Sequence, residues 1–199
     1  MIPSEYASYA APRYENVSND KVLLHTHAFF KNGIELDPAS SKFADKYVNA
    51  KTYYTPIDDG LNDQEWFDDV YLFPPATNYY WNEQTERWHA GRKYGRKICS
   101  GSALWFRKMK QKWMKREFRQ GLFFTNQPDI AMICQDIFDF PVCFMNFRPT
   151  LTRVYYADDK VERSNTGMCL IIYMPPHGDS GNKTDEFVKQ FSSLGKILY

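Results

Sequence analysis

The sequence predicts an α/β fold in which a single mixed sheet is flanked by helices. Short apolar runs of three to six residues, typical of buried strands, alternate with longer segments whose apolar residues recur every three to four positions, typical of amphipathic helices. Strands that alternate with helices build a sheet covered by helices. The chain has 199 residues and no visible internal repeat, which favours one domain.

The N-terminal part of the chain is expected to hold the shorter elements. Residues 1–20 are polar and aperiodic, so we expect an extended arm ahead of a domain at 21–199. The run at 70–73 is a clear strand, and Pro74-Pro75 ends it because proline cannot donate to a sheet ladder. The other elements expected before residue 102 are a strand at 34–37, a helix at 40–48, a short extended piece at 51–54 and a loop at 77–101.

The C-terminal part contains the strongest helix, expected at 102–120. Trp105, Met109 and Trp113 recur every four residues on one side, and basic residues occupy the other side. After it we expect a strand at 122–124 and then a helix opened by Asn126-Gln127-Pro128, whose core stripe is Ile130, Ile133, Cys134 and Ile137. Further strands are expected at 142–144, 151–155 and 169–174, with a turn at 158–160. The last element expected is a helix capped by Thr184 and ended by Gly195.

Positive charge is concentrated in one block. Twelve Lys and Arg lie between Arg87 and Arg119 with one acidic residue, Glu117, although the whole chain is only +1. Such a block needs an anionic neighbour, which is a nucleic acid or an acidic surface on this protein or on a partner. The internal candidate is the acidic run Asp58, Asp59, Asp63, Glu65, Asp68 and Asp69.

Several classes of protein are excluded by what the sequence lacks. No apolar run is long enough to span a bilayer, and the N-terminus has no basic and apolar leader, so we expect neither a membrane protein nor a secretory signal. The four cysteines (Cys99, Cys134, Cys143 and Cys169) are too scattered for a disulfide framework and fit an intracellular site, or an assembly in a virion or organelle. His25 and His27 would share a face of a strand, but their spacing predicts no metal site.

Two stretches resemble the phage DNA N6-adenine methyltransferase family. The resemblance covers residues 28–176 in outline, and residues 35–75 are its specific part. The matching features of the first stretch are Glu35-Leu36-Asp37-Pro38-Ala39-Ser40-Ser41, Asn49-Ala50, Tyr53-Tyr54-Thr55, Asp58-Asp59-Gly60-Leu61, Gln64, Trp66, Val70 and Phe73-Pro74-Pro75. Those of the second are Trp105-Phe106, the strand at 122–124, Pro141-Val142, Arg148 and the strand at 169–174 before Pro175.

The resemblance implies a Rossmann-like, S-adenosylmethionine-dependent methyltransferase fold. It also implies that an acidic residue at the end of an early strand faces the cofactor, which makes Asp37 or Glu35 the candidate cofactor-binding carboxylate. Such a carboxylate accepts hydrogen bonds from ribose hydroxyls or from a cationic amine. A turn that only ends the strand is the alternative for Asp37-Pro38.

The sequence departs from the family at the catalytic motif. The family places Asn/Asp-Pro-Pro-Tyr/Phe after its strand, so that oxygen acceptors hold the adenine amino group and an aromatic ring stacks on the flipped base. Here the motif reads Phe73-Pro74-Pro75-Ala76, which has neither the acceptor nor the ring. The family's W-x-T-P entry is also replaced, by residues 25–28. We therefore identify no catalytic residue and expect the adenine reaction to be lost.

The segment after this motif mixes rings with cations. Rings stack on bases and cations meet phosphates, so the segment is a candidate nucleic-acid-binding surface, with protein docking as the equal alternative. Its candidate residues are Tyr79, Tyr80, Trp81, Trp88, Arg92, Lys93, Tyr94, Arg96 and Lys97.

Taken together, these features predict a catalytically inactive, methyltransferase-like protein that serves as a binding or structural subunit of a larger assembly. Protein partners are expected and nucleic acid is a second candidate partner. S-adenosylmethionine is the candidate cofactor, and no metal is expected. The alternatives are an active S-adenosylmethionine-dependent DNA adenine methyltransferase with a remodelled active site, and a protein–protein subunit that contacts no nucleic acid.

Overall fold

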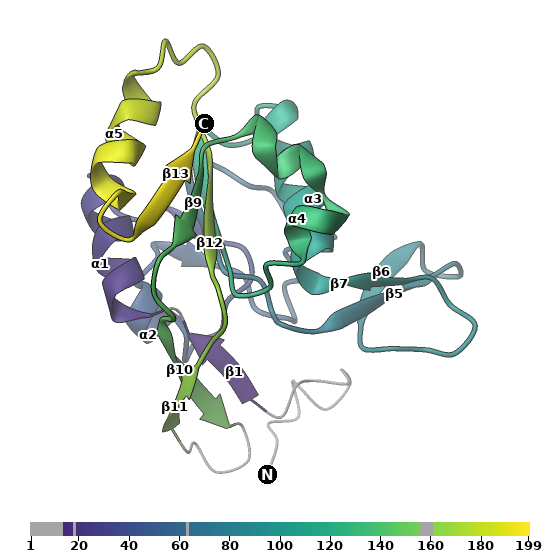
Figure 1. The fold of residues 1–199 in the computed structure, drawn as a ribbon. Helices are drawn as coiled ribbons and strands as arrows, with labels where there is room; N and C mark the ends of the chain where they lie inside the picture. The colour runs from purple at the N-terminus through teal and green to yellow at the C-terminus, as the bar shows by residue number, and fades with distance from the viewer. Residues whose placement is uncertain (1–13, 18, 63, 156–160) are drawn as a thin grey trace.

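A seven-stranded mixed sheet forms the centre of the protein (Figure 1). The computed structural model describes residues 14–17, 19–62, 64–155 and 161–199. The strands of the large sheet, in spatial order, are β13 (Gly195–Leu198), β9 (Val142–Met145), β12 (Leu170–Met174), β8 (Gln120–Thr125), β4 (Asp69–Leu72), β2 (Leu36–Asp37) and β3 (Thr52–Tyr53). The predicted α/β class with a single large mixed sheet is confirmed.

The strands run in two patterns. β3, β2, β4 and β8 are parallel to one another, whereas β12 is antiparallel to both β8 and β9, and β13 is antiparallel to β9. β4 and β8 are buried along their whole length, as the apolar runs within them predict.

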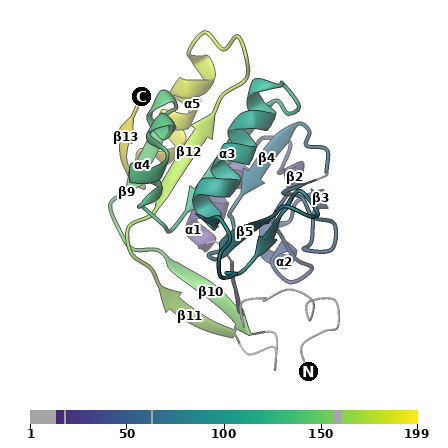
Figure 2. The ribbon, with the colours of Figure 1, turned by 90° about the vertical axis from the view of Figure 1, so that its right-hand side faces the viewer.

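Helices cover both faces of the large sheet (Figures 1 and 2). On one face lie α1 (Asp20–Phe29), α2 (Asp45–Val48) and α5 (Asn182–Phe191); on the other lie α3 (Gly101–Met114), α4 (Ile130–Ile133) and the 3₁₀ helix η2 (Gln135–Asp139). Successive strand residues point to opposite faces, so Tyr71 packs with the α1 side and Leu72 with the α3 side. In the described part of the chain, no helix is long and apolar enough to cross a membrane.

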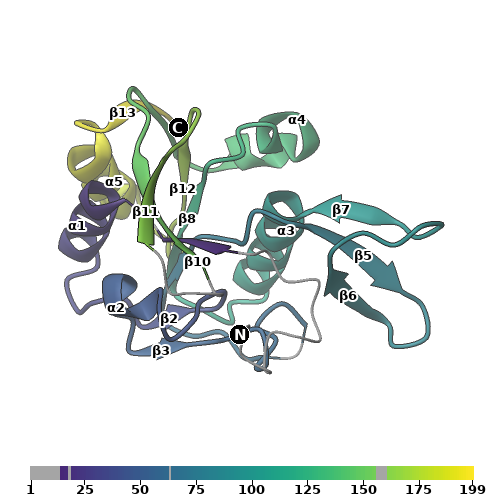
Figure 3. The ribbon, with the colours of Figure 1, turned by 90° about the horizontal axis from the view of Figure 1, so that it is seen from below.

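Two three-stranded sheets extend from the carboxyl edge of the parallel strands (Figure 3). One, the hairpin sheet, contains β5 (Asn78–Asn82), β6 (Arg87–Ala90) and β7 (Ile98–Ser100), and it connects β4 to α3. The other contains β1 (Tyr14–Val17), β10 (Thr150–Tyr155) and β11 (Val161–Asn165), and its two longer strands connect β9 to β12. Of the predicted arm at 1–20, residues 14–17 form β1, Asn19 caps α1, and Asp20 is the first residue of α1. Residues 1–13 and 18, and the predicted turn at 158–160, lie outside the described ones.

The prediction of a loop throughout 77–101 is wrong, because 78–82, 87–90 and 98–100 are the strands of the hairpin sheet. The turn between β5 and β6 places Glu86 at φ 52°, a conformation for which glycine or asparagine is the usual marker. His25 and His27 belong to α1 rather than to a strand, so they do not share a face as they would on a strand.

Several helix boundaries also differ from the predictions. The strong helix ends at Met114 rather than 120, because Arg116 takes a left-handed φ of 59°. Cys134 interrupts the helical geometry of the next segment, which divides into α4 and η2 and leaves Ile133 exposed. The helix expected at 40–48 is reduced to α2. The N-cap of α5 is Gly181 rather than the predicted Thr184. α5 ends at Phe191, and the predicted end point Gly195 is instead the first residue of β13.

Candidate ligand site at the carboxyl edge of the sheet

The order of the strands reverses between β2 and β4. From β2 the chain continues to β3 on one side and then returns to β4 on the other side. In open α/β sheets, ligands bind outside the carboxyl ends of the strands at such a switch point. The two segments that follow these ends are residues 38–41 and the Phe73–Ala76 turn, which are the segments that carry the predicted cofactor and catalytic motifs.

Asp37 lies at the carboxyl end of β2 with its side chain almost fully buried. The residue is 3% exposed, and Oδ1 accepts a hydrogen bond from the backbone N–H of Ala39 at 3.1 Å. Glu35, the other predicted carboxylate, forms an ion pair with Lys51 at 2.5 Å. Because β2 ends at Asp37, Asp37 is the one of these two carboxylates that lies at the carboxyl end of the strand.

Ser40 is a second polar group at this end of β2, and its sequence position alone did not predict a role for it. Its Oγ is buried and has no hydrogen-bond partner; among the described residues only Thr26 Oγ1 shares this property. Buried hydroxyls in proteins are nearly always paired, so an unpaired one suggests a missing partner. Asp37 and Ser40 are the polar groups at this end of β2 that could hold a ligand with hydroxyl or amine groups.

Gly60 packs closely against the turn that follows β2. A Cβ at this position would lie 2.1 Å from the carbonyl oxygen of Pro38 and 3.2 Å from the ring of Tyr54. The indole N–H of Trp66 donates to the Gly60 carbonyl at 3.1 Å, and the backbone N–H of Ser40 donates to the Tyr54 carbonyl at 2.9 Å. The connection at 54–66 therefore packs directly on the segment that contains Asp37 and Ser40.

The turn after β4 holds no acceptor at its first position. The ring of Phe73 packs against Phe124, with centroids 4.8 Å apart, on the α1 side of the sheet. Ala76 is exposed. The turn is fixed against the start of α3, since the Gly101 N–H donates to the Thr77 carbonyl at 2.7 Å and a Cβ on Gly101 would lie 2.5 Å from the Pro75 carbonyl oxygen.

A buried polar cluster lies beside this turn. Ser102 Oγ donates to Gln127 Oε1 at 2.7 Å and lies 2.9 Å from Thr125 Oγ1. The cluster joins the first turn of α3 to the end of β8. The Gln127 side-chain carbonyl therefore accepts a hydrogen bond from within the protein.

The hairpin sheet divides its predicted nucleic-acid-binding residues between two faces. Tyr79 points inward: it is buried, and its hydroxyl accepts from the Trp105 indole N–H at 3.0 Å. Trp88 packs on the same core, and Trp81 meets it edge-to-face at 5.5 Å. Tyr79 and Trp88 therefore attach the hairpin sheet to the body of the protein.

The outer face presents rings and cations. The rings of Tyr80 and His89 stack with centroids 5.5 Å apart, and Lys93 Nζ lies 5.8 Å from the Tyr80 centroid. Tyr94 is fully exposed. Arg96 pairs with Glu83 at 2.5 Å. Arg92, Lys93 and Lys97, in contrast, have no carboxylate within 4.0 Å among the described residues. Lys97 lies on the other face, where its Nζ is 6.0 Å from the Trp88 centroid.

Much of the remaining positive block is neutralised inside the molecule. Lys110 pairs with Asp136 at 2.8 Å and Asp139 at 3.2 Å, and Lys112 pairs with Glu117. Arg119 pairs with Asp69 at 2.5 Å, which ties one end of the predicted acidic run to the block. The internal charge complement therefore accounts for these residues of α3 and the turn after it, but not for Arg92, Lys93 and Lys97.

Asp69 belongs to a buried network at the opposite, amino edge of the strands. Its Oδ1 accepts from Gln120 Nε2 at 3.0 Å, and Gln120 Oε1 accepts from the Tyr173 hydroxyl at 2.8 Å. Burial raises the pKa of Asp69, although Gln120 and Arg119 act in the opposite direction. Burial likewise raises the pKa of Tyr173.

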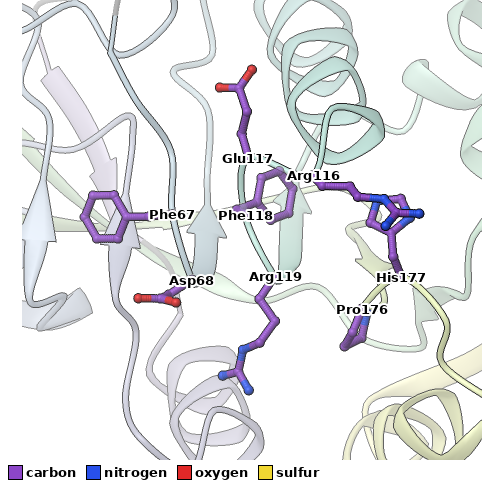
Figure 4. Close-up of a pocket in the computed structure, with 8 residues that line it drawn as sticks. All are labelled: Phe67, Asp68, Arg116, Glu117, Phe118, Arg119, Pro176 and His177. Atoms are coloured by element: carbon purple, nitrogen blue, oxygen red, sulfur yellow. The ribbon is translucent and has the colours of Figure 1, made fainter.

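A surface hollow of about 400 Å³ lies beside this network, at the amino edge (Figure 4). His177 stacks on Trp113 at 4.2 Å and bonds through Nε2 to the Trp113 carbonyl at 2.6 Å. The hollow contains neither Asp37 nor the Phe73 turn. Its lining residues are Phe67, Asp68, Arg116, Glu117, Phe118, Arg119, Pro176 and His177.

The described residues contain no cluster of three His, Cys, Asp or Glu suited to a metal ion. Burial raises the pKa of the Cys134, Cys143 and Cys169 thiols, that of Cys143 to about 12.

Comparison of the chain with protein-family models, with curated proteins and with solved structures found no match.

Proposed function

We propose that this chain is a methyltransferase-like protein that binds S-adenosylmethionine at the switch point, does not methylate adenine, and holds nucleic acid on the hairpin sheet as a subunit of a larger assembly. The single observation that supports this most is the switch point itself. There, a buried carboxylate and an unpaired buried hydroxyl follow one strand, and a phenylalanine follows the next.

Asp37 and Ser40 are the residues proposed to hold the ligand. The Asp37 carboxylate accepts hydrogen bonds from ribose hydroxyls or from the ligand's amine, and the Ser40 hydroxyl gains the partner that it lacks. Bound S-adenosylmethionine would supply an electrophilic methyl group. The residues of this chain would orient the ligand through one charged and one neutral contact.

Loss of the adenine reaction follows from the chemistry of Phe73. Methyl transfer to an exocyclic amine needs acceptors that align the nitrogen lone pair, and a hydrocarbon ring packed on Phe124 provides none. Removing one placed polar group of this kind costs about 2.7–4 kcal/mol in transition-state stabilisation.

The hairpin sheet supports the nucleic-acid part of the proposal. It starts directly after the Phe73–Ala76 turn, which follows one of the two strands of the switch point. Tyr80 and Tyr94 offer rings for stacking, and Lys93 offers a charge without a carboxylate partner among the described residues.

Calorimetric titration with S-adenosylmethionine tests the ligand site. Wild type should bind, while Asp37→Asn and Ser40→Ala should each weaken binding about tenfold, the loss of one good hydrogen bond. Glu65→Gln is the matched control: Glu65 is an exposed acid on the connection that packs on the site, and its replacement should leave affinity unchanged. Absence of heat with millimolar ligand would exclude the cofactor part of the proposal.

A further inference from the structure

A row of three side chains crosses the outer face of the hairpin sheet. Tyr80 of β5 lies directly opposite His89 of β6 on one side and Ile98 of β7 on the other, so the three share one face. The Tyr80 and His89 rings stack at an interplanar angle of 21°, and Ile98 is 41% exposed. Figure 3 shows this sheet projecting from the body of the protein beside α3, where a long ligand can reach it.

The connection from β6 to β7 adds an exposed ring and two cations. The side chain of Tyr94 is fully exposed, which leaves both faces of its ring open to a ligand. Lys93 Nζ lies 5.8 Å from the Tyr80 centroid. The Arg92 guanidinium lies beside the side-chain amide of Asn78, which is on the same face as Tyr80. In the described part of the chain, neither cation has a carboxylate within 4.0 Å.

The charge of the hairpin sheet complements a nucleic acid, and its rings favour one form of it. Residues 78–100 contain five basic and two acidic residues, so the sheet is positively charged. A duplex keeps the faces of its bases inside the helix, and proteins that bind it tightly typically contact about 6–10 phosphates, far more than two cations can. An unpaired base presents its whole face, and loss of one base–ring stack typically weakens binding about five- to 150-fold. Exposed rings with few cations therefore favour a single strand.

We propose that the hairpin sheet binds single-stranded nucleic acid in preference to a duplex, with unpaired bases stacked on Tyr80 and Tyr94 and with Lys93 and Arg92 against the phosphates. This inference rests on the proposed nucleic-acid function and names the form that is bound. Because every base has a ring face, stacking distinguishes little between sequences, and it does not use the 2′-hydroxyl that separates RNA from DNA. Single-stranded DNA and RNA are therefore expected to bind alike.

Fluorescence anisotropy with the full chain and four labelled probes of about 16 nucleotides tests the preference. The probes are a DNA strand, its duplex, an RNA strand of the same sequence, and an abasic DNA strand, which keeps the phosphates but has no bases. Both base-containing single strands should bind at least about tenfold more tightly than the duplex and the abasic strand, which is the effect of one stack. A difference of about tenfold or more between DNA and RNA would overturn recognition by stacking.

Substitution of the rings tests the named residues. Tyr94→Ala should weaken single-strand binding about tenfold and leave duplex binding unchanged, and it cannot disturb the packing of the fold because Tyr94 is fully exposed. Tyr80→Ala should act in the same direction. Tyr80→Phe and Tyr94→Phe are the matched controls, because they keep the ring and should therefore keep the affinity. Single-strand binding that neither alanine variant changes would refute the proposal.

The outcomes also separate this inference from the proposed function. Equal affinity for the DNA strand and its duplex would refute the single-strand preference, whereas the nucleic-acid function would stand. Absence of binding to every probe at about 100 µM protein, the weak end of non-specific affinities, would refute both.

Discussion

Replacing Gly60 with alanine should destabilise the protein through the turn that carries the proposed ligand site. The new Cβ would lie 2.1 Å from the Pro38 carbonyl oxygen, where ordinary contact needs more than 3 Å, so the backbone of one of the two segments must move by about 1 Å. Overpacking of this kind typically costs about 1–3 kcal/mol, and contact with the Pro38 backbone rather than with the end of a flexible side chain favours the upper end.

Urea denaturation followed by circular dichroism measures this effect. With an m value of about 3 kcal/mol/M, a loss of about 3 kcal/mol lowers the midpoint by about 1 M. Gly167→Ala is the matched control, because no atom lies within 4 Å of the Cβ it would add. It should be neutral or slightly stabilising. Equal midpoints for Gly60→Ala and wild type would refute the close packing of residue 60 on Pro38.

Three further predictions concern other parts of the molecule. Ser40→Ala should leave thermal stability unchanged or raise it by about 1 kcal/mol, because the hydroxyl it removes is buried and unpaired, even though ligand affinity falls. Asp69→Asn should make the free energy of unfolding depend less on pH. Because burial raises the pKa of Asp69 in the folded protein, this residue stabilises the fold most below its ordinary pKa. That stabilisation is lost as pH rises through the raised pKa. Combined alanine substitution of Arg92, Lys93 and Lys97 should reduce the slope of log affinity against log salt for DNA by about 2–3.

Each of these predictions has an outcome that contradicts it. Clear destabilisation by Ser40→Ala would show that the hydroxyl has a partner. A stability advantage of wild type over Asp69→Asn that grows with pH would show that the pair with Arg119 outweighs burial. For the hairpin sheet, an unchanged salt slope contradicts the nucleic-acid surface. Its control replaces three exposed lysines outside the hairpin sheet, namely Lys42, Lys46 and Lys189.

The core strands could be predicted from the sequence because burial on both faces produces continuous apolar runs. β4, β8 and β12 all lie within or around the runs at 70–73, 122–124 and 169–174. The hairpin sheet could not be predicted in this way. Its alternation pairs buried Tyr79 with half-exposed Tyr80, and both faces carry aromatic residues, so the pattern of period two is hidden.

The candidate site was predictable only in part. The end of a strand at Asp37 and the missing acceptor at Phe73 can be read from single positions. The role of Ser40 depends on a hydroxyl that lacks a partner in three dimensions, and no sequence pattern contains that information. The pairing of Glu35 with Lys51, and of Arg96 with Glu83, likewise depends on contacts between elements.

The central claim is that the scaffold binds a methyl donor but no longer transfers the methyl group to adenine. Incubating the wild-type protein with methyl-labelled S-adenosylmethionine and adenine-containing DNA, at concentrations where calorimetry detects bound donor, tests this claim most directly. We predict bound donor and no label on the DNA. Label on the amino group of adenine would contradict the claim, because another group would then have to perform the task that Phe73 cannot.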